Sequence, residues 1–181
     1  MRLSLKLHPD SICAAVVGID VEVARASAGS LVLSYIVTGT IGDLRLPALA
    51  APVRTDELWK HTCFEVFVCA TAADSYYEFN FAPSTQWAAY RFDGYRSGMT
   101  VASEIGAPRI DVQSNAERYE LQVALALDPL PGAAKWRLGL SAMIEETNGR
   151  KSYWALAHPP SKPDFHHADC FTLELAAPSR P

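Results

Sequence analysis

A glutamate stands in the middle of the apolar segment CFEVFV, six residues after a tryptophan in the polar stretch TDELWKH. The alternation places Glu65 on the face opposite Phe64 and Val66, as expected for a β-strand. A carboxylate on a half-buried sheet face is costly unless it is hydrogen-bonded or paired. Glu65 therefore either holds the sheet together or faces a ligand, and we interpret it, with Trp59, as part of a ligand site.

Polar side chains recur at matching positions in two further segments, YYEFNFA and QWAAYRF. In the first, Glu78 and Asn80 lie opposite three aromatic core residues; in the second, alternation groups Trp87 with Arg91. If these strands are neighbours of the Glu65 strand, the five side chains share one sheet face. Carboxylates, an amide, a guanidinium and an indole together suit a polyhydroxylated ligand. A salt-bridged outer face, for instance Glu78 with Arg91, is the alternative.

The elements that must position these side chains are strands, because period-two segments dominate the chain. In QWAAYRF we place Tyr90 and Phe92 on the core side. We expect twelve strands, at Leu3–Leu7, Ile19–Arg25, Leu31–Thr38, Cys63–Cys69, Tyr76–Ala82, Trp87–Phe92, Met99–Glu104, Arg109–Gln113, Arg118–Leu125, Trp136–Ile144, Tyr153–Leu156 and Cys170–Leu175. About a dozen short strands with frequent turns indicate an all-β, antiparallel, immunoglobulin-like β-sandwich, formed as a single domain over residues 1–181.

Three local signals refine this picture. The segment SICAAVVGID is the one candidate for a short helix, although its β-branched residues weaken it. Asn148-Gly149 is the strongest hairpin signal in the chain, between an apolar strand and SYWAL. The loop PALAAPVRTDE and the tail APSRP are the expected irregular segments.

Composition and charge exclude several classes of protein. With 181 residues, nearly half of them apolar, the chain can bury a sizeable core. The net charge of −4 and the scattered Lys and Arg residues do not fit a nucleic-acid binder, and no apolar run reaches membrane-spanning length. The N-terminal segment lacks the features of a signal peptide, and the four cysteines do not form a disulfide framework. We therefore expect a cytoplasmic protein with reduced cysteines, and neither a nucleic acid nor a membrane as partner.

Three blocks carry a resemblance to a known family: RTDELWKHTCFEVFV, YYEFNFAPSTQWAAYRFDGYR and YWALAHPPSKPDFHHADCF. Together they resemble the DOMON-like superfamily, and more narrowly a bacterial group of stand-alone DOMON-like proteins. The resemblance runs from about Leu31 to Phe171. It implies an immunoglobulin-like β-sandwich whose relatives bind either sugars or haem.

The resemblance also implies roles for particular residues. Family-nine carbohydrate-binding modules, which are relatives, clamp a terminal sugar between two tryptophans beside a glutamate on the adjoining strand. Trp59 and Glu65 match the first tryptophan and this glutamate in kind and order. Trp154 is our choice for the second tryptophan, and Trp87 is the alternative. Those modules are secreted, so a cytoplasmic location favours a small sugar, a nucleotide sugar or another metabolite. In the haem-binding relatives Met and His are the axial ligands; His61 or His158 could ligate iron, but no matched Met–His pair is visible here.

The segment AHPPSKPDFHHADC is a second candidate site. Nitrogen and sulfur ligands that converge in space could bind zinc, with weak candidates in His166, His167, Asp169 and Cys170. No CxxC or HxxxH pair is present, and extended neighbours such as His166 and His167 would point apart. The alternative is a proline-rigidified loop whose histidines bond to backbone.

The function that these observations favour is a small-molecule binding module that recognises a carbohydrate or a sugar-containing metabolite. Stacking would come from the tryptophans, hydrogen bonds from Glu65, Glu78, Asn80 and Arg91, and the edge of the site from His61 or His158. No nucleophile–base–orienter set is visible, so we lean against an enzyme and expect no cofactor. A zinc enzyme, a haem-binding domain and a protein-interaction module with a flat aromatic face are the alternatives. The oligomeric state is left open.

Overall fold

The computed structural model describes residues 1–27, 30–70, 73–127, 130 and 135–176, so the tail APSRP lies outside the described part of the chain. In these ranges no helix is long and apolar enough to cross a membrane. The strands are β1 (Arg2–Leu7), β2 (Val16–Ser27), β3 (Ser30–Gly39), β4 (Cys63–Ala70), β5 (Tyr76–Phe81), β6 (Trp87–Phe92), β7 (Thr100–Val101), β8 (Arg109–Ser114), β9 (Arg118–Ala126), β10 (Lys135–Glu145), β11 (Lys151–Ala155) and β12 (Leu173–Ala176). Three short 3-10 segments are η1 (Ile41–Asp43), η2 (Leu58–Lys60) and η3 (Ala168–Cys170).

The predicted strands are confirmed, since each overlaps one observed strand. Two local predictions differ from the structure. The helix suggested in SICAAVVGID is wrong: the chain enters β2 at Val16, and Ile19 pairs with Val37 of β3. β-branched residues favour a half-buried strand once a partner strand is present. The strand expected at Met99–Glu104 shortens to Thr100–Val101.

The Asn148-Gly149 hairpin is confirmed, with a loop of different length. The backbone N–H of Glu146 donates to the Arg150 carbonyl over 2.8 Å, so three residues form the loop instead of two. Gly149 has a φ of 85°, which a residue with a side chain rarely adopts. The side chain of Asn148 accepts a hydrogen bond from the Arg150 N–H over 2.8 Å. A three-residue hairpin with glycine in the left-handed position is the next most common solution after the two-residue turn.

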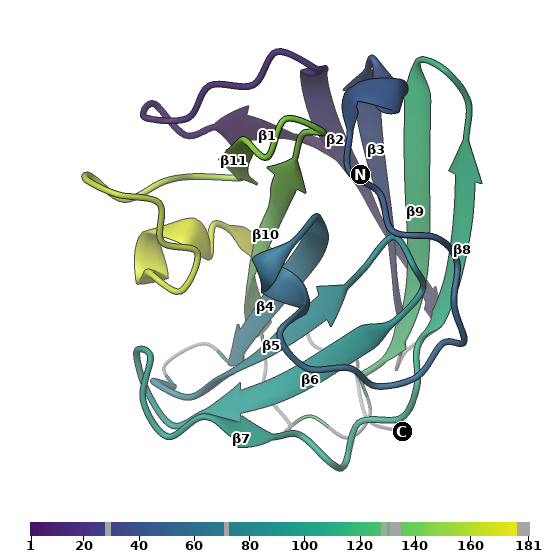
Figure 1. Ribbon diagram of the computed structural model, residues 1–181. Helices are drawn as coiled ribbons and strands as arrows, with labels where there is room; N and C mark the ends of the chain where they lie inside the picture. The colour runs from purple at the N-terminus through teal and green to yellow at the C-terminus, as the bar shows by residue number, and fades with distance from the viewer. Residues whose placement is uncertain (28–29, 71–72, 128–129, 131–134, 177–181) are drawn as a thin grey trace.

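The named strands pair in antiparallel fashion into one curled sheet, in the order β7-β6-β5-β4-β10-β11-β1-β2-β3-β9-β8, with β12 on β10 (Figure 1). β1 joins the two halves, because Leu3 pairs with Val21 of β2 whereas Lys6 pairs with Ala155 of β11. The prediction of an all-β antiparallel fold is confirmed. The immunoglobulin-like sandwich topology stays a prediction.

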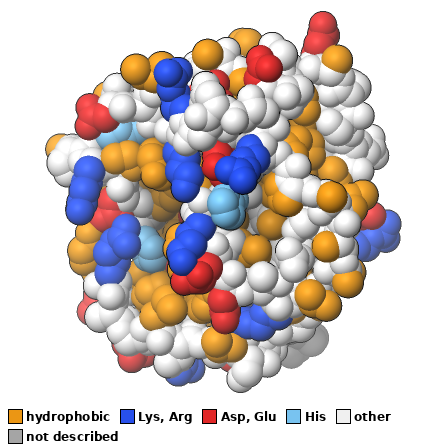
Figure 2. Space-filling model, viewed as in Figure 1, with side chains coloured by type: hydrophobic (Ala, Val, Ile, Leu, Met, Phe, Trp, Pro, Cys, Tyr) orange, Lys and Arg blue, Asp and Glu red, His pale blue; other side chains and the backbone are white. Residues whose placement is uncertain are grey.

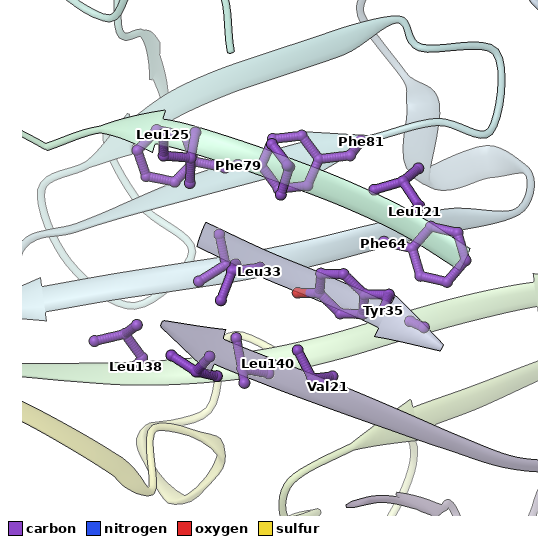
Figure 3. Packing of buried hydrophobic residues seen from close by; sticks show 14 of the residues in the cluster. Val21, Leu33, Tyr35, Phe64, Phe79, Phe81, Leu121, Leu125, Leu138 and Leu140 are labelled. Carbon is purple, nitrogen blue, oxygen red and sulfur yellow. The ribbon is translucent and has the colours of Figure 1, made fainter. Parts of the chain in front are cut away.

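The two halves of the curled sheet meet over one hydrophobic core. Tyr35 of β3 and Phe64 of β4 have ring centroids 5.1 Å apart, and Phe64 stacks on Tyr119 of β9 at 5.9 Å. Leu33 and Leu138 lie in the same cluster (Figure 3). The Tyr35 hydroxyl donates to the backbone carbonyl of Glu65 over 2.6 Å. A buried polar link therefore joins the core to the strand that carries Glu65.

The opposite face of β4, β5 and β6 carries a second apolar cluster, which corrects one prediction. Tyr90 and Phe92 belong to this outer cluster, whereas Trp87 lies in the main core. The faces of β6 are thus the reverse of those we predicted. β6 is apolar on both faces except for the exposed Arg91, so alternation alone does not show which face is inward.

Substitution of two buried tyrosines tests the hydrogen bond between Tyr35 and the backbone of Glu65. Tyr35→Phe removes a buried hydrogen bond, and we expect the free energy of unfolding to fall by about 1 kcal/mol. Tyr119 is the matched control: its hydroxyl is buried and has no hydrogen-bond partner among the described residues, so Tyr119→Phe should be neutral or stabilising. Urea unfolding of both variants measures the difference. Equal losses in the two variants would contradict this account.

Candidate ligand-binding site

A cavity of about 430 Å³ opens on the outer face of β4, β5, β10 and β11, under the loops that follow β6 and β11. It combines carboxyl groups, a guanidinium and an imidazole with aromatic and sulfur-containing side chains. Its lining residues are Trp59, Glu65, Glu78, Phe92, Arg96, Met99, Met143, Tyr153, Pro163, Phe165 and His166. Sites for small molecules have volumes of roughly 300–1,000 Å³ and a mixed lining of this kind.

Glu65 reaches the cavity from the middle of β4 and is 4% exposed. The Ser141 hydroxyl of β10 donates to its Oε2 over 3.4 Å. Its Oε1 receives no hydrogen bond from the described residues. Burial, followed by the nearby charge of Glu78, raises the pKa of Glu65 well above its ordinary value.

Glu78 reaches the cavity from β5, where it is 5% exposed. Asn80, on the same face of β5, donates from Nδ2 to Oε1 of Glu78 over 2.7 Å. The thiol of Cys63 contacts Oδ1 of Asn80 at 3.5 Å, which fixes the orientation of the amide. Burial raises the pKa of Glu78 to about 6, against the opposing effects of Asn80 and the Arg96 charge. Asn80 thus supports the site from behind the cavity wall.

His166 closes one side of the cavity as a neutral imidazole. Its Nδ1 hydrogen-bonds with the Tyr76 hydroxyl over 2.8 Å, and its Nε2 lies 3.7 Å from Oε2 of Glu78. The ring packs edge-on against Phe67 and Phe92, each with centroids 5.1 Å away. Burial and the positive charge of Arg96 lower the pKa of His166 to about 4.

Arg96 is fixed by an ion pair that joins the two loops over the cavity. Its Nε and Nη2 donate to Oδ1 of Asp164 over 3.1 and 2.6 Å. Tyr95 also donates to Asp164, and the His166 N–H donates to Oδ1 over 3.1 Å. Burial acts to raise the pKa of Asp164, but the bonds from Arg96 and Tyr95 outweigh it, so this pKa lies below its ordinary value. Asp164 therefore remains charged and orders both loops.

Trp59 belongs to η2, just before β4, and its ring packs edge-on against Tyr90 with centroids 5.6 Å apart. It is 36% exposed, unusual for so large an apolar side chain. The structure therefore brings the predicted Trp59, Glu65 and Glu78 to one cavity, with Asn80 behind them.

The other predicted binding residues lie elsewhere. Trp87 and Trp154 are buried in the main core, and Trp154 donates to the Ser152 hydroxyl over 3.0 Å. Arg91 is on the face of β6 that points away from the cavity, because Tyr90 opposes Glu78 and Phe92 opposes Tyr76. Tyr153, the neighbour of Trp154 in β11, lines the cavity in its place.

Neither edge histidine lines the cavity. His158 contacts the Lys6 carbonyl through Nε2 at 2.7 Å and packs against His8 at the far end of β1. His61 is 61% exposed and bonds through Nδ1 to Oε2 of Glu145 over 2.7 Å. The bond of His158 to backbone is the alternative that the sequence left open for the histidine-rich loop.

The weak zinc candidates do not converge on one point. His166 faces the cavity, whereas His167 accepts from the Asp169 N–H over 3.2 Å at the start of η3. Asp169 is exposed, and the buried thiol of Cys170 bonds to the Asp164 carbonyl over 3.2 Å. Within the described ranges, no group of three or more His, Cys, Asp or Glu side chains is placed to hold a metal ion.

Sequence reasoning missed Arg96 and Tyr153 and assigned His166 only to a metal site. Arg96 lies in the turn FDGYRSG, where it has a φ of 51°. A non-glycine residue in the left-handed region often marks a functional turn, but backbone angles are not visible in a sequence. Tyr153 could have been found, because alternation places it on the face of β11 opposite to Trp154.

Comparison with known proteins gives structural relatives only: no model of a known family matches the chain, and neither does any curated protein sequence. An inferred carbohydrate-binding protein from Bacteroides uniformis ATCC 8492 superposes with a TM-score of 0.71 at 16% identity, over 97% of this chain and 85% of that one. A family-nine carbohydrate-binding module from Caldicellulosiruptor kristjanssonii, in complex with glucose, gives 0.52 at 12% identity over 98% and 86%. The same kind of module with cellotriose gives 0.54 at 11% over 99% and 84%. These likenesses establish the fold, and the narrower DOMON-like resemblance stays a prediction.

The raised pKa of Glu78 has a consequence for stability. A carboxyl whose pKa rises on folding destabilises the folded state as pH increases from its unfolded pKa, near 4.5, through its folded pKa, about 6. Glu78→Gln should therefore match the native protein in stability below about pH 4.5 and exceed it by about 2 kcal/mol above pH 6. Glu120→Gln, on β9, is the control: this carboxylate accepts from Arg118 over 2.7 Å, so its removal should not stabilise the protein.

Urea unfolding of the three proteins between about pH 4 and pH 8 measures this effect. A Glu78→Gln variant that is equally stable or less stable at every pH would contradict the cost we assign to the ionised carboxylate.

Proposed function

We propose that this protein binds a carbohydrate, one sugar unit of which occupies the cavity between β4, β5 and the two covering loops. The single observation that carries the proposal is the combination of exposed Trp59 with the buried carboxyl groups of Glu65 and Glu78 in one cavity of about 430 Å³. Aromatic rings pack against the apolar face of a sugar, and carboxyl groups accept hydrogen bonds from its hydroxyls.

Each side of the cavity has a separate role in this proposal. Trp59 and Tyr153 supply aromatic surface. Oε1 of Glu65, which receives no hydrogen bond from the described residues, accepts one from a sugar hydroxyl. Arg96 is held by Asp164 and so presents its remaining donors at low entropic cost. The rigid strands hold the acids while the loops hold Arg96 and His166. That arrangement preorganises the site.

The likeness to sugar-binding modules supports this proposal at the level of the fold. The zinc alternative gains less from the geometry, because Nδ1 of His166 is engaged by Tyr76 and its Nε2 faces Glu78. The haem alternative gains less because its candidate ligands, His61 and His158, do not line the cavity. A flat interaction face would also differ from the concave, partly polar cavity that we describe.

Thermal-shift measurements test the proposal. The ligands are glucose, cellobiose, N-acetylglucosamine and the corresponding sugars that carry a free amino group at C2. A ligand at about 100 times its Kd should raise the apparent Tm by roughly 5–10 °C for a chain of this size. Trp59→Ala should remove most of that rise without lowering the Tm of the free protein by more than a few degrees, because Trp59 is partly exposed.

Leu49→Ala is the matched control, since Leu49 is 71% exposed and does not line the cavity. This variant should retain the full ligand-dependent rise. If no sugar in the series raises the Tm of the native protein, the proposed function is wrong.

A further inference from the structure

The cavity holds more negative than positive charge. Glu65 and Glu78 are buried on neighbouring strands, and neither forms an ion pair with a lysine or arginine in the described part of the chain. The guanidinium of Arg96 forms its ion pair with Asp164 and not with either glutamate. His166, the remaining candidate cation, stays neutral near pH 7 because its pKa is about 4. Within the described ranges the two glutamates therefore have no lysine or arginine in direct contact, and the Arg96 charge acts on them only from a distance.

Two carboxyl oxygens are also left without donors. Oε1 of Glu65 receives no hydrogen bond from the described residues, and Oε2 of Glu78 has only the long 3.7 Å approach of His166. Ser141 and Asn80 occupy the other oxygen of each group. Both residues line the cavity, and acceptors without protein donors in a partly enclosed site are costly, most of all when they are ionised. A ligand that supplies both donors and positive charge would remove both costs at once.

We propose that the sugar bound in this cavity carries a protonated amino group, which lies between Glu65 and Glu78. This inference rests on the proposed carbohydrate function and names the class of sugar. A primary ammonium has three donors and a full charge, so it can bond to the free oxygen of each glutamate. A neutral hydroxyl can donate only once and leaves the repulsion between the two acids in place.

The remaining groups around the carboxyl pair are compatible with a cation. From β4 and β5 they are the neutral thiol of Cys63, the Asn80 amide and the Tyr76 hydroxyl; from β10 comes the Ser141 hydroxyl. The loops contribute the Arg96–Asp164 ion pair and neutral His166. Trp59 and Tyr153 line the same cavity, and the face of an aromatic ring attracts cations.

Three disaccharides with the same linkage test the inference: cellobiose, N,N′-diacetylchitobiose and chitobiose, which bear hydroxyl, acetamido and amino groups at C2. In calorimetry at about pH 7, chitobiose should bind about tenfold more tightly than cellobiose, because charge-assisted hydrogen bonds are stronger than neutral ones. The preference should shrink at high salt, through screening, and as the pH falls toward 5, because Glu78 gains a proton near pH 6.

Glu65→Gln and Glu78→Gln should each abolish the preference for chitobiose over cellobiose, since glutamine keeps the shape and an acceptor oxygen but carries no charge. Glu120→Gln, outside the cavity on β9, should retain the full preference. Because the comparison of the three sugars is made on the native protein, it holds even if one variant fails to fold.

Equal or tighter binding of cellobiose or diacetylchitobiose by the native protein would overturn this inference and leave the proposed carbohydrate function standing. Binding of none of the three would overturn both. Calcium alone raising the Tm, with the rise lost in Glu65→Gln, would also overturn it, because the carboxyl pair would then be a cation site of another kind.

Discussion

The burial of two carboxyl groups on adjacent strands is the constraint on which the rest of the site depends. Glu65 and Glu78 sit where the sheet is covered on both faces, and the free energy cost of ionising them there is reflected in their raised pKa values. Ser141 and Asn80 offset part of that cost through hydrogen bonds. These two hydrogen bonds reach one oxygen of each carboxyl group, and the cavity beside the carboxyl groups stays open.

Because of this constraint, the strands and the loops of the site are held in place by different interactions. Strands β4 and β5 are fixed by the core behind them, where Tyr35 bonds to the backbone of β4. The loops need their own support, and Asp164 provides it by binding Arg96 and the backbone of His166. The face of the molecule drawn in Figure 2 carries basic, acidic, histidine and hydrophobic side chains intermixed, unlike the single-sign surface of a nucleic-acid binder.

Distant relatives with the same curled architecture share at most 16% of their residues with this chain among those compared. A fold can persist at such identity because alternation and turns are enough to specify strands, whereas ligand specificity depends on a few side chains. The side chains that line the cavity, more than the fold, therefore decide what is bound here.

The sequence by itself determined the strands and the inward faces of β4 and β5, because polar side chains recur on one face of each at a period of two. Of the residues that it proposed for a site, Trp59, Glu65 and Glu78 line the cavity and Asn80 bonds to Glu78. Tertiary structure decided what alternation could not. β6 is apolar on both faces, so Trp87 and Arg91 were assigned to the wrong side. Arg96 and His166 reach the cavity from loops, whose paths are set by long-range contacts with Asp164 and Tyr76 that have no local sequence signal.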